Sequence, residues 1–233
     1  MAIKRIVCTV TNDLHYDQRM RRICTSLSNA GYQVTLIGRR LPHSPSLNKQ
    51  PYSQKRLFCF FTKGKLFYAE YNVRLFLYLL FLPADLFCAI DLDTILPNYL
   101  ASLIRRKKRV YDAHELFCEM EEIVSRPSIY RIWKGIERWA VPRFPQGYTI
   151  GTCYAQEFEK MYGVHYAVVR NATVLQPEPP AYQAGEKYIL YQGAVNEGRC
   201  FETLIPAMRH VDCRLLICGE GNFFEQAQQL VKS

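Results

Sequence analysis

Three short polar segments of this chain each follow an apolar, strand-like run, and they contain the residues best suited to acid–base chemistry. These residues are Asn12, Asp13 and Asp17 after the first run, Asp93 after the second, and His114 and Glu115 after the third. In an open parallel sheet, ligands bind just beyond the carboxyl ends of the strands, so the three segments are expected to form one site. We expect the imidazole of His114 to bind or polarise a hydroxyl group there.

Some of these acids have a simpler structural interpretation. Asp13 or Asp17 could cap the helix that follows them, and Asp93 could cap a helix that begins near Ile95, because Asp is a favoured N-cap residue. A bound metal is not expected, because the histidines other than His114 show no ligand spacing. These histidines are at positions 15, 43, 165 and 210.

Strand and helix patterns alternate along the chain, which is typical of a parallel sheet with helices on both faces. We therefore expect an α/β fold built from Rossmann-like units. The expected strands are 5–10, 33–37, 57–61, 86–90, 109–113, 148–151, 167–170, 188–192 and 214–218. The expected helices are one that ends before Gly31, and 95–104, 129–139, 155–162, 201–210 and 223–231.

A proline-containing segment, 173–186, divides the chain. Pro177, Pro179 and Pro180 give it the composition of a linker. We expect a complete first domain over 1–172 and the start of a second over 187–233. The second contains only two strands, each followed by glycine, which is too few for a whole nucleotide-binding domain.

The two glycine-containing turns of the second domain could hold a phosphate group. Gly193 and Arg199 precede a helix, so backbone N–H groups and a cation could face an anion. Gly219, Glu220 and Gly221 follow the next strand and would let a ligand approach the backbone closely. Plain strand-to-helix turns would use the same glycines, and Arg199 could be an ordinary surface residue. Neither turn is the GxGxxG fingerprint, which argues against a nicotinamide-dependent oxidoreductase.

Positive charge is concentrated in the first half of the chain. Residues 1–110 contain 18 Lys and Arg against 6 Asp and Glu, whereas 111–233 contain 12 against 15. The first half is therefore expected to meet a membrane surface, a phosphorylated lipid or nucleic acid, unless its charge is only a solvated surface. The run Leu75–Leu82 is too short to span a bilayer, which needs roughly 20 apolar residues. Together with Phe67–Val73 it predicts either a core helix or a helix that lies in a bilayer interface.

The nine cysteines form no CxxC pair, and their odd number argues against a complete disulfide framework. The first residues place Lys4 and Arg5 directly before a strand and lack the apolar core and cleavage site of a signal peptide. We therefore expect a reducing, cytoplasmic environment.

Taken together, these residues resemble retaining glycosyltransferases of family 4, which have the GT-B fold. The segments that carry the resemblance in the first domain are 12–22, 31–37, 91–97 and 111–117. Arg170–Ala172 resembles the hinge that leads into the second domain of this family. The segments 191–199, 202–205 and 216–221 resemble the start of its donor domain. The resemblance covers essentially the whole chain, and the matching segments occur in the order and at the spacing of the family.

The resemblance implies transfer of a sugar from a nucleotide-sugar donor to an acceptor hydroxyl with retained configuration, and without a metal or other cofactor. It places His114 beside the donor sugar, the loop Asn12–Asp17 along the cleft, and Asp93 with Glu115 on the acceptor side. The acceptor would be a glycan or a lipid-linked molecule in surface polysaccharide or glycolipid synthesis. An anionic membrane surface on the cytoplasmic side would be a further partner. Nucleic acid would not be a partner.

On the donor side, the resemblance implies that the diphosphate meets Gly193 and Arg199, and that the nucleotide lies near Gly219–Gly221. Ala194 stands where many relatives have an arginine, and Cys200 where a glycine is usual. The paired glutamates that hold the donor in this family would lie beyond the last residue of the sequence.

Two hypotheses follow. The first is a family 4 glycosyltransferase with a truncated donor domain, impaired or inactive alone unless a separate chain completes it. The second is a non-catalytic binding or membrane-associated module derived from a glycosyltransferase, which uses the basic first half for contact.

Overall fold

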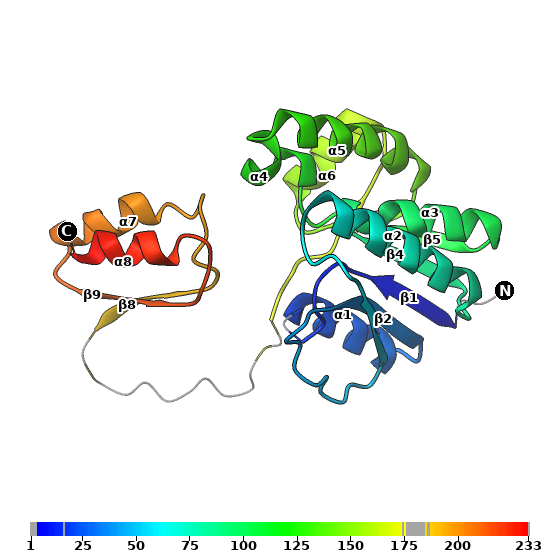
Figure 1. The fold of residues 1–233 in the computed structure, drawn as a ribbon, viewed down its shortest axis with the longest axis horizontal. Helices are drawn as coiled ribbons and strands as arrows, with labels where there is room; N and C mark the ends of the chain where they lie inside the picture. Colours follow the sequence, from blue (N-terminus) through cyan, green and yellow to red (C-terminus); the bar gives the residue numbers. More distant parts are fainter. Residues whose placement is uncertain (1–3, 16, 174, 176–184, 186, 233) are drawn as a thin grey trace. The chain divides into compact units, whose positions relative to one another are not determined.

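The chain forms two compact units, Met1–Thr173 and Val174–Ser233, each with its own sheet (Figure 1). The computed structural model describes residues 4–15, 17–173, 175, 185 and 187–232. Most of the expected linker, 173–186, lies outside the described residues.

The first unit is built on a seven-stranded parallel sheet with the order β3-β2-β1-β4-β5-β6-β7. Its strands are β1 (Arg5–Thr9), β2 (Gln33–Arg40), β3 (Ser53–Phe58), β4 (Leu86–Ile90), β5 (Lys108–Asp112), β6 (Gly147–Thr149) and β7 (Ala167–Val168). The order places β1, β4 and β5 side by side, so their carboxyl ends are neighbours at one edge. The expected α/β Rossmann-like fold is confirmed.

The expected strand 57–61 is wrong, because β3 begins at Ser53 and ends at Phe58. β3 is the edge strand and pairs with β2 from Ser53 opposite Thr35 onward. An edge strand leaves many side chains partly exposed, so polar residues such as Lys55 are compatible with it. The apolar residues that follow Phe58 suggested a strand, but they lie beyond the last paired residue.

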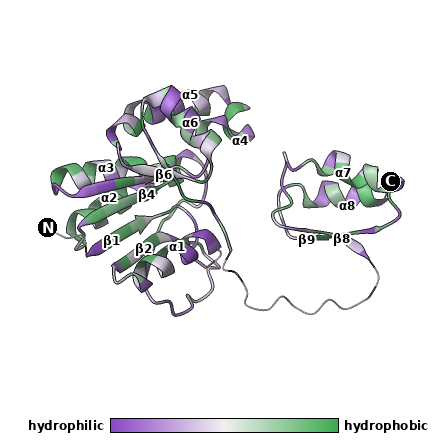
Figure 2. Cartoon of the chain, turned by 180° about the vertical axis from the view of Figure 1, so that it is seen from behind, coloured by the Kyte–Doolittle hydropathy of each residue, from purple (hydrophilic) through white to green (hydrophobic). Residues whose placement is uncertain are grey.

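Helices cover both faces of this sheet, although unequally (Figure 1). They are α1 (Gln18–Asn29), α2 (Gly64–Phe81), α3 (Ile95–Ile104), α4 (Glu121–Val124), α5 (Pro127–Ala140) and α6 (Thr152–Tyr162), with short 3-10 turns at Leu92–Thr94, Phe117–Glu119 and Val141–Arg143. On one face, Met20 and Cys24 of α1 pack in a cluster with Cys8. On the other, Tyr71 of α2 packs in a cluster with Val7. The strands are mostly green in Figure 2, as expected for a sheet covered on both faces.

α2 contains the apolar run Leu75–Leu82 almost entirely. Tyr71 and Leu79 are fully buried, so one side of the helix is part of the core, as the first interpretation of this run predicted. On the other side, Leu77 is 51% exposed and Phe81 is 83% exposed. Among the described residues, no helix has the length and apolarity needed to cross a lipid bilayer.

The second unit pairs β8 (Tyr188–Gln192) and β9 (Arg214–Cys218) in parallel. α7 (Phe201–Ala207), a 3-10 turn at Met208–His210, and α8 (Phe224–Lys232) accompany them. Val195 and Phe201 are fully buried and pack with Ile205 and Ala227. The side chains of Leu190 and Leu216 on these strands are about half exposed, so the sheet is less well covered than that of the first unit.

Candidate functional site

The carboxyl ends of β1, β4 and β5 bring together one group of polar side chains, which we call the strand-end rim. The rim consists of Thr11, Asp91, Asp93, Asp112 and His114. Four buried polar atoms of the rim have no hydrogen-bond partner among the described residues. They are Asp91 Oδ1, Asp93 Oδ1, Asp112 Oδ2 and His114 Nδ1. The rim therefore brings three carboxyl groups and one imidazole together at the strand ends.

Asp91 was missed by the sequence analysis, and its backbone is unusual. Its φ is 60°, in the left-handed region that residues other than glycine rarely adopt. The N–H of Asp91 donates to the carbonyl of Asp112 at 3.1 Å, which holds it beside β5. Its Oδ1 lies 3.1 Å from Nδ1 of His114, without the alignment of a hydrogen bond. Burial, and then the charge of Asp93, raise the pKa of Asp91 well above its usual range.

Asp93 is only 7% exposed and accepts a short hydrogen bond from the Thr11 hydroxyl. Burial raises its pKa to about 7, although the hydrogen bond from Thr11 acts in the opposite direction. Within the described part of the chain, no side chain makes a capping hydrogen bond at the start of α3, so Asp93 does not cap that helix. Instead its backbone carbonyl accepts from Asn72 Nδ2 at 3.0 Å.

Burial, and then the positive charge of Arg19, lower the pKa of the His114 imidazole, which favours its neutral form. Nearby acids act in the opposite direction without reversing the shift. A neutral imidazole can donate one hydrogen bond and accept another, as binding a hydroxyl group requires.

Arg19 of α1 forms an ion pair with Asp112, with Nη2 2.6 Å from Oδ1. The side chain of Asp112 is fully buried and that of Arg19 is 12% exposed. Neither residue was expected from the sequence to belong to the site. The acid at the last position of β5 is the only sequence signal that could have pointed to this pair.

The structure places the remaining first-domain candidates around the rim, in mostly structural contacts. Asp17 caps α1, because its Oδ1 accepts from the N–H of Met20 at 2.9 Å, and its Oδ2 accepts from Asn12 Nδ2 at 3.4 Å. Asp13 is buried and forms an ion pair with Arg56 at 3.2 Å. Burial opposes ionisation of Asp13, but hydrogen bonds from the Ser44 hydroxyl, the N–H of His15 and Arg56 together lower its pKa. Glu115 is exposed.

In the second unit, Gly219 and Gly221 allow the two strand-end loops to pack against each other. A Cβ on Gly219 would lie 1.8 Å from the carbonyl oxygen of Gly193, and one on Gly221 would lie 2.2 Å from that of Val195. The carbonyl of Glu220 accepts from the N–H of Val195 at 2.9 Å. The simpler interpretation of these glycines, as strand-to-helix turns, therefore accounts for them.

Arg199 is exposed in the turn before α7. Cys200, next to it, has a φ of 59°. This is the left-handed conformation that glycine adopts readily, at the position where the resemblance leads one to expect glycine. Among the described residues, no three His, Cys, Asp or Glu side chains are grouped so that they could hold a metal ion.

No protein-family model matches the sequence, and no curated protein matches it. Solved structures do match. The lipopolysaccharide outer core galactosyltransferase WaaB, in its apo form, gives a TM-score of 0.59 at 12% identity over 99% of this chain and 64% of that chain. Sucrose-phosphate synthase from Thermosynechococcus elongatus gives a TM-score of 0.67 at 14% identity, over 92% of this chain and 62% of that chain. Arabidopsis thaliana UGT89C1, complexed with UDP-L-rhamnose, gives a TM-score of 0.58 at 10% identity, over 95% of this chain and 69% of that chain.

The fold is of the GT-B type. The chain spans less than two thirds of the length of the first two proteins, 64% and 62%.

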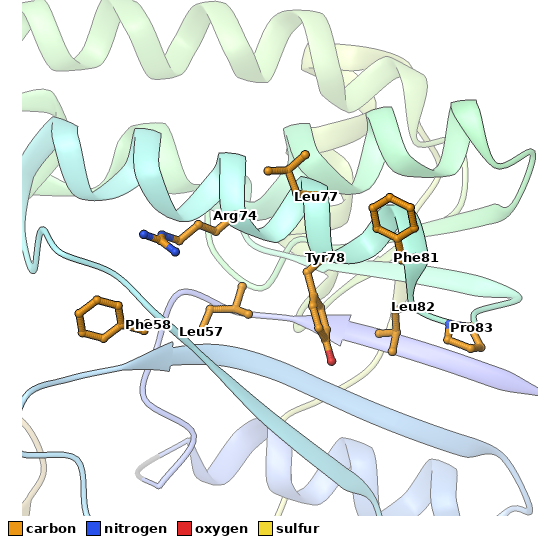
Figure 3. A pocket seen from close by; sticks show the side chains of 8 residues that line it. All are labelled: Leu57, Phe58, Arg74, Leu77, Tyr78, Phe81, Leu82 and Pro83. Atoms are coloured by element: carbon orange, nitrogen blue, oxygen red, sulfur yellow. The ribbon is translucent and has the colours of Figure 1, made fainter.

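The first unit of this GT-B fold also has an apolar hollow of about 600 Å³ between the end of β3 and the outer side of α2 (Figure 3). Phe58, Leu77 and Phe81 line it, and Arg74 contributes a cation. None of its lining residues belongs to the strand-end rim.

Proposed function

We propose that this chain belongs to a retaining, nucleotide-sugar-dependent glycosyltransferase of family 4, which transfers a sugar to an acceptor hydroxyl without a metal ion. The observation that carries the proposal is the pairing of His114 with Asp91, Nδ1 to Oδ1 at 3.1 Å, at the strand ends of a GT-B fold, where burial lowers the pKa of the imidazole and raises that of Asp91. The solved structures that match include proteins named as a galactosyltransferase and as a complex with UDP-L-rhamnose, which supports a nucleotide-sugar donor. The acceptor would be a glycan or a lipid-linked molecule in surface polysaccharide or glycolipid synthesis.

His114 would hold a hydroxyl of the donor sugar, and Asp93 would meet the acceptor. A neutral imidazole orients a hydroxyl without adding charge beside the departing phosphate. In a retaining transfer, the acceptor oxygen bonds to the anomeric carbon on the face from which the phosphate leaves. The acceptor proton can then pass to the leaving phosphate oxygen. In the second unit, Gly193, Arg199 and the turn Gly219–Gly221 would meet the diphosphate and the nucleotide.

Donor binding and transfer are best measured separately, because the chain spans only part of its structural neighbours. Calorimetric titration with UDP-glucose, UDP-galactose, UDP-N-acetylglucosamine and GDP-mannose tests the donor. Release of the nucleoside diphosphate in the presence of a glycan or glycolipid acceptor tests transfer. His114→Ala is expected to slow transfer at least tenfold, since one positioned polar group of this kind typically contributes that much or more.

His165→Ala is the matched control, because the side chain of His165 is 80% exposed. EDTA is expected to leave the rate unchanged. The proposal is contradicted if none of the four nucleotide sugars binds, or if His114→Ala transfers as fast as the wild type.

A second candidate function, membrane association, is favoured by the apolar hollow of Figure 3. Phe58, Leu77 and Phe81 are each more than half exposed, and Arg74, which lines the same hollow, adds a cation. Apolar side chains flanked by cations are suited to an anionic bilayer surface. Sedimentation with vesicles of phosphatidylcholine and phosphatidylglycerol, at low and high salt, tests this. A non-catalytic module would bind vesicles with or without His114→Ala and would transfer no sugar, whereas Phe81→Ser would weaken binding in either case.

A further inference from the structure

A second cavity of the first unit, of about 440 Å³, lies between α2 and the α4–α5 segment. Its walls are mainly apolar and aromatic, and include Tyr68, Leu92, Leu96, Ile129, Trp133 and Ile136. Both its volume and its lining are typical of small-molecule sites, which are largely apolar with a few polar groups. None of its lining residues lines the hollow of Figure 3.

This cavity shares a wall with the strand-end rim. Leu92 stands between Asp91 and Asp93 in the sequence and lines the cavity. Asn72 also lines it, and its Nδ2 donates to the backbone carbonyl of Asp93 at 3.0 Å. The pKa of Tyr68 is raised by burial and then by the charge of Asp93, as expected for a phenol near that carboxyl group. A ligand in the cavity would therefore lie next to the acids of the rim.

Aromatic contacts fix the shape of the cavity. The rings of Tyr68 and Trp133 meet edge to face, with their centroids 5.3 Å apart. Trp133 meets Phe117 in the same way at 5.1 Å, and Phe117 is buried in the core. One wall is therefore held by packing with the core. The cavity is open to solvent at Ile132, which lines it and is 52% exposed.

Charged side chains surround the open part of the cavity. Lys65, Glu122 and Arg126 line it and are exposed, so they place two cations and one anion beside an apolar interior. A hydrocarbon chain would match the interior, and a polar or anionic group attached to it would match the two cations.

We propose that this cavity binds the apolar part of the acceptor, a hydrocarbon chain attached to the accepting sugar, while that sugar lies at the strand-end rim. The inference rests on the proposed function for the identity of the rim ligand. It selects a lipid-linked acceptor over a free glycan. The hydrocarbon chain of the acceptor occupies the space between Tyr68, Leu96 and Ile136.

Alkyl glucosides of increasing chain length test this site, at concentrations below micelle formation. The probes are methyl, hexyl and octyl β-D-glucopyranoside, which share one sugar. The chain has two tryptophans, and in a Trp139→Phe background the fluorescence of Trp133 in the cavity wall becomes the only tryptophan signal. We expect affinity to rise with chain length, by up to about fourfold for each methylene that is buried. The methyl glucoside should bind weakest.

Two variants locate the binding. Ala69→Phe fills the cavity from an exposed position on α2, and Ile132→Glu places a charge at its open end. Each is expected to reduce octyl glucoside affinity at least tenfold. Val73→Phe is the matched control, because Val73 lies on the same helix, is 59% exposed and does not line the cavity. It should bind the octyl probe like the wild type.

Equal affinity for the methyl and octyl probes would overturn the inference, as would octyl binding that survives both Ala69→Phe and Ile132→Glu. This failure is distinct from failure of the proposed function. Nucleotide-sugar binding without chain-length dependence would leave the glycosyltransferase proposal standing and remove the lipid site. Chain-length dependence without any nucleotide-sugar binding would leave an apolar ligand site and remove the enzyme.

Discussion

Replacing Asp93 by Asn is expected to make the first unit more stable at neutral and alkaline pH. Asp93 is buried, and burial raises its pKa to about 7. In unfolded chains an Asp titrates near 3.9, so between pH 4 and 7 the folded state holds a proton that the unfolded state has released. Stability contributed by this proton is therefore present at acid pH and is lost as the pH rises to 7.

The magnitude follows from the interval between the two pKa values. Each pH unit corresponds to about 1.4 kcal/mol, so three units amount to about 4 kcal/mol as an upper value. Asn removes the ionisation, and its side-chain carbonyl can still accept from the Thr11 hydroxyl. Asp93→Asn should thus raise the free energy of unfolding by about 3 kcal/mol at pH 8 and change it little at pH 4.

Urea unfolding followed by tryptophan fluorescence measures this change in the first unit. Trp133 and Trp139 are the only tryptophans, and both lie in α5. Asp13→Asn is the matched control with the opposite sign. The pKa of Asp13 is lowered by its partners, so its ionisation stabilises the fold above pH 4, and the variant should be less stable at pH 8.

The pH dependence of Asp93→Asn decides whether this reasoning holds. If Asp93→Asn is no more stable than the wild type at pH 8, its carboxylate carries no burial penalty. The account of the rim as a site with raised pKa values would then be refuted. A gain in stability that is equal at pH 4 and pH 8 would also refute it, because the effect would not arise from ionisation.

Three further substitutions test separate parts of the structure. Arg19→Gln should cost about 3 kcal/mol of stability, because it leaves Asp112 buried without its cation, and NMR titration should show a higher pKa for His114, which Arg19 lowers. Gly135→Ala in α5 should stabilise the first unit by about 0.5–1 kcal/mol, because the added Cβ would meet no atom of the described residues within 4 Å. Urea unfolding measures this gain, and a loss of stability would contradict the open space at this position. Cys200→Gly should stabilise the second unit by about 0.5–1 kcal/mol by relieving the left-handed backbone, and slower amide exchange in α7 would show it.

Local sequence patterns predicted much of the fold because buried parallel strands leave a clear signal. Leu86–Ile90, Tyr188–Gln192 and Arg214–Cys218 are strands with the expected bounds. β3 is an edge strand with a low apolar content, so its sequence pattern was weak and its predicted bounds were wrong. The pattern of α2 could not show which side faces the core, because the helix is apolar almost all round.

The location of the candidate site was predictable, whereas its internal contacts were not. The strand ends that carry Asp93 and His114 are neighbours because β4 and β5 pair directly. The partners of the rim, however, come from residues 82 and 93 positions apart, Thr11 with Asp93 and Arg19 with Asp112. Such pairings depend on the order of the strands and on how α1 packs. The positive φ of Asp91 is likewise a property of the folded backbone and leaves no pattern in the sequence.

The unpartnered atoms of the rim restrict the kind of ligand that fits it. Within the described part of the chain, Asp91, Asp93 and Asp112 each leave one buried oxygen without a hydrogen bond, and His114 leaves Nδ1. A phosphate is a poor fit because its negative charge would be repelled by whichever of these acids is ionised, and an apolar molecule would satisfy none of these atoms. A sugar hydroxyl both donates and accepts, so several adjacent hydroxyls could serve all four atoms whether the acids are protonated or ionised. The rim is thus suited to the sugar portion of a substrate, and the phosphates of a nucleotide sugar must find their cations elsewhere.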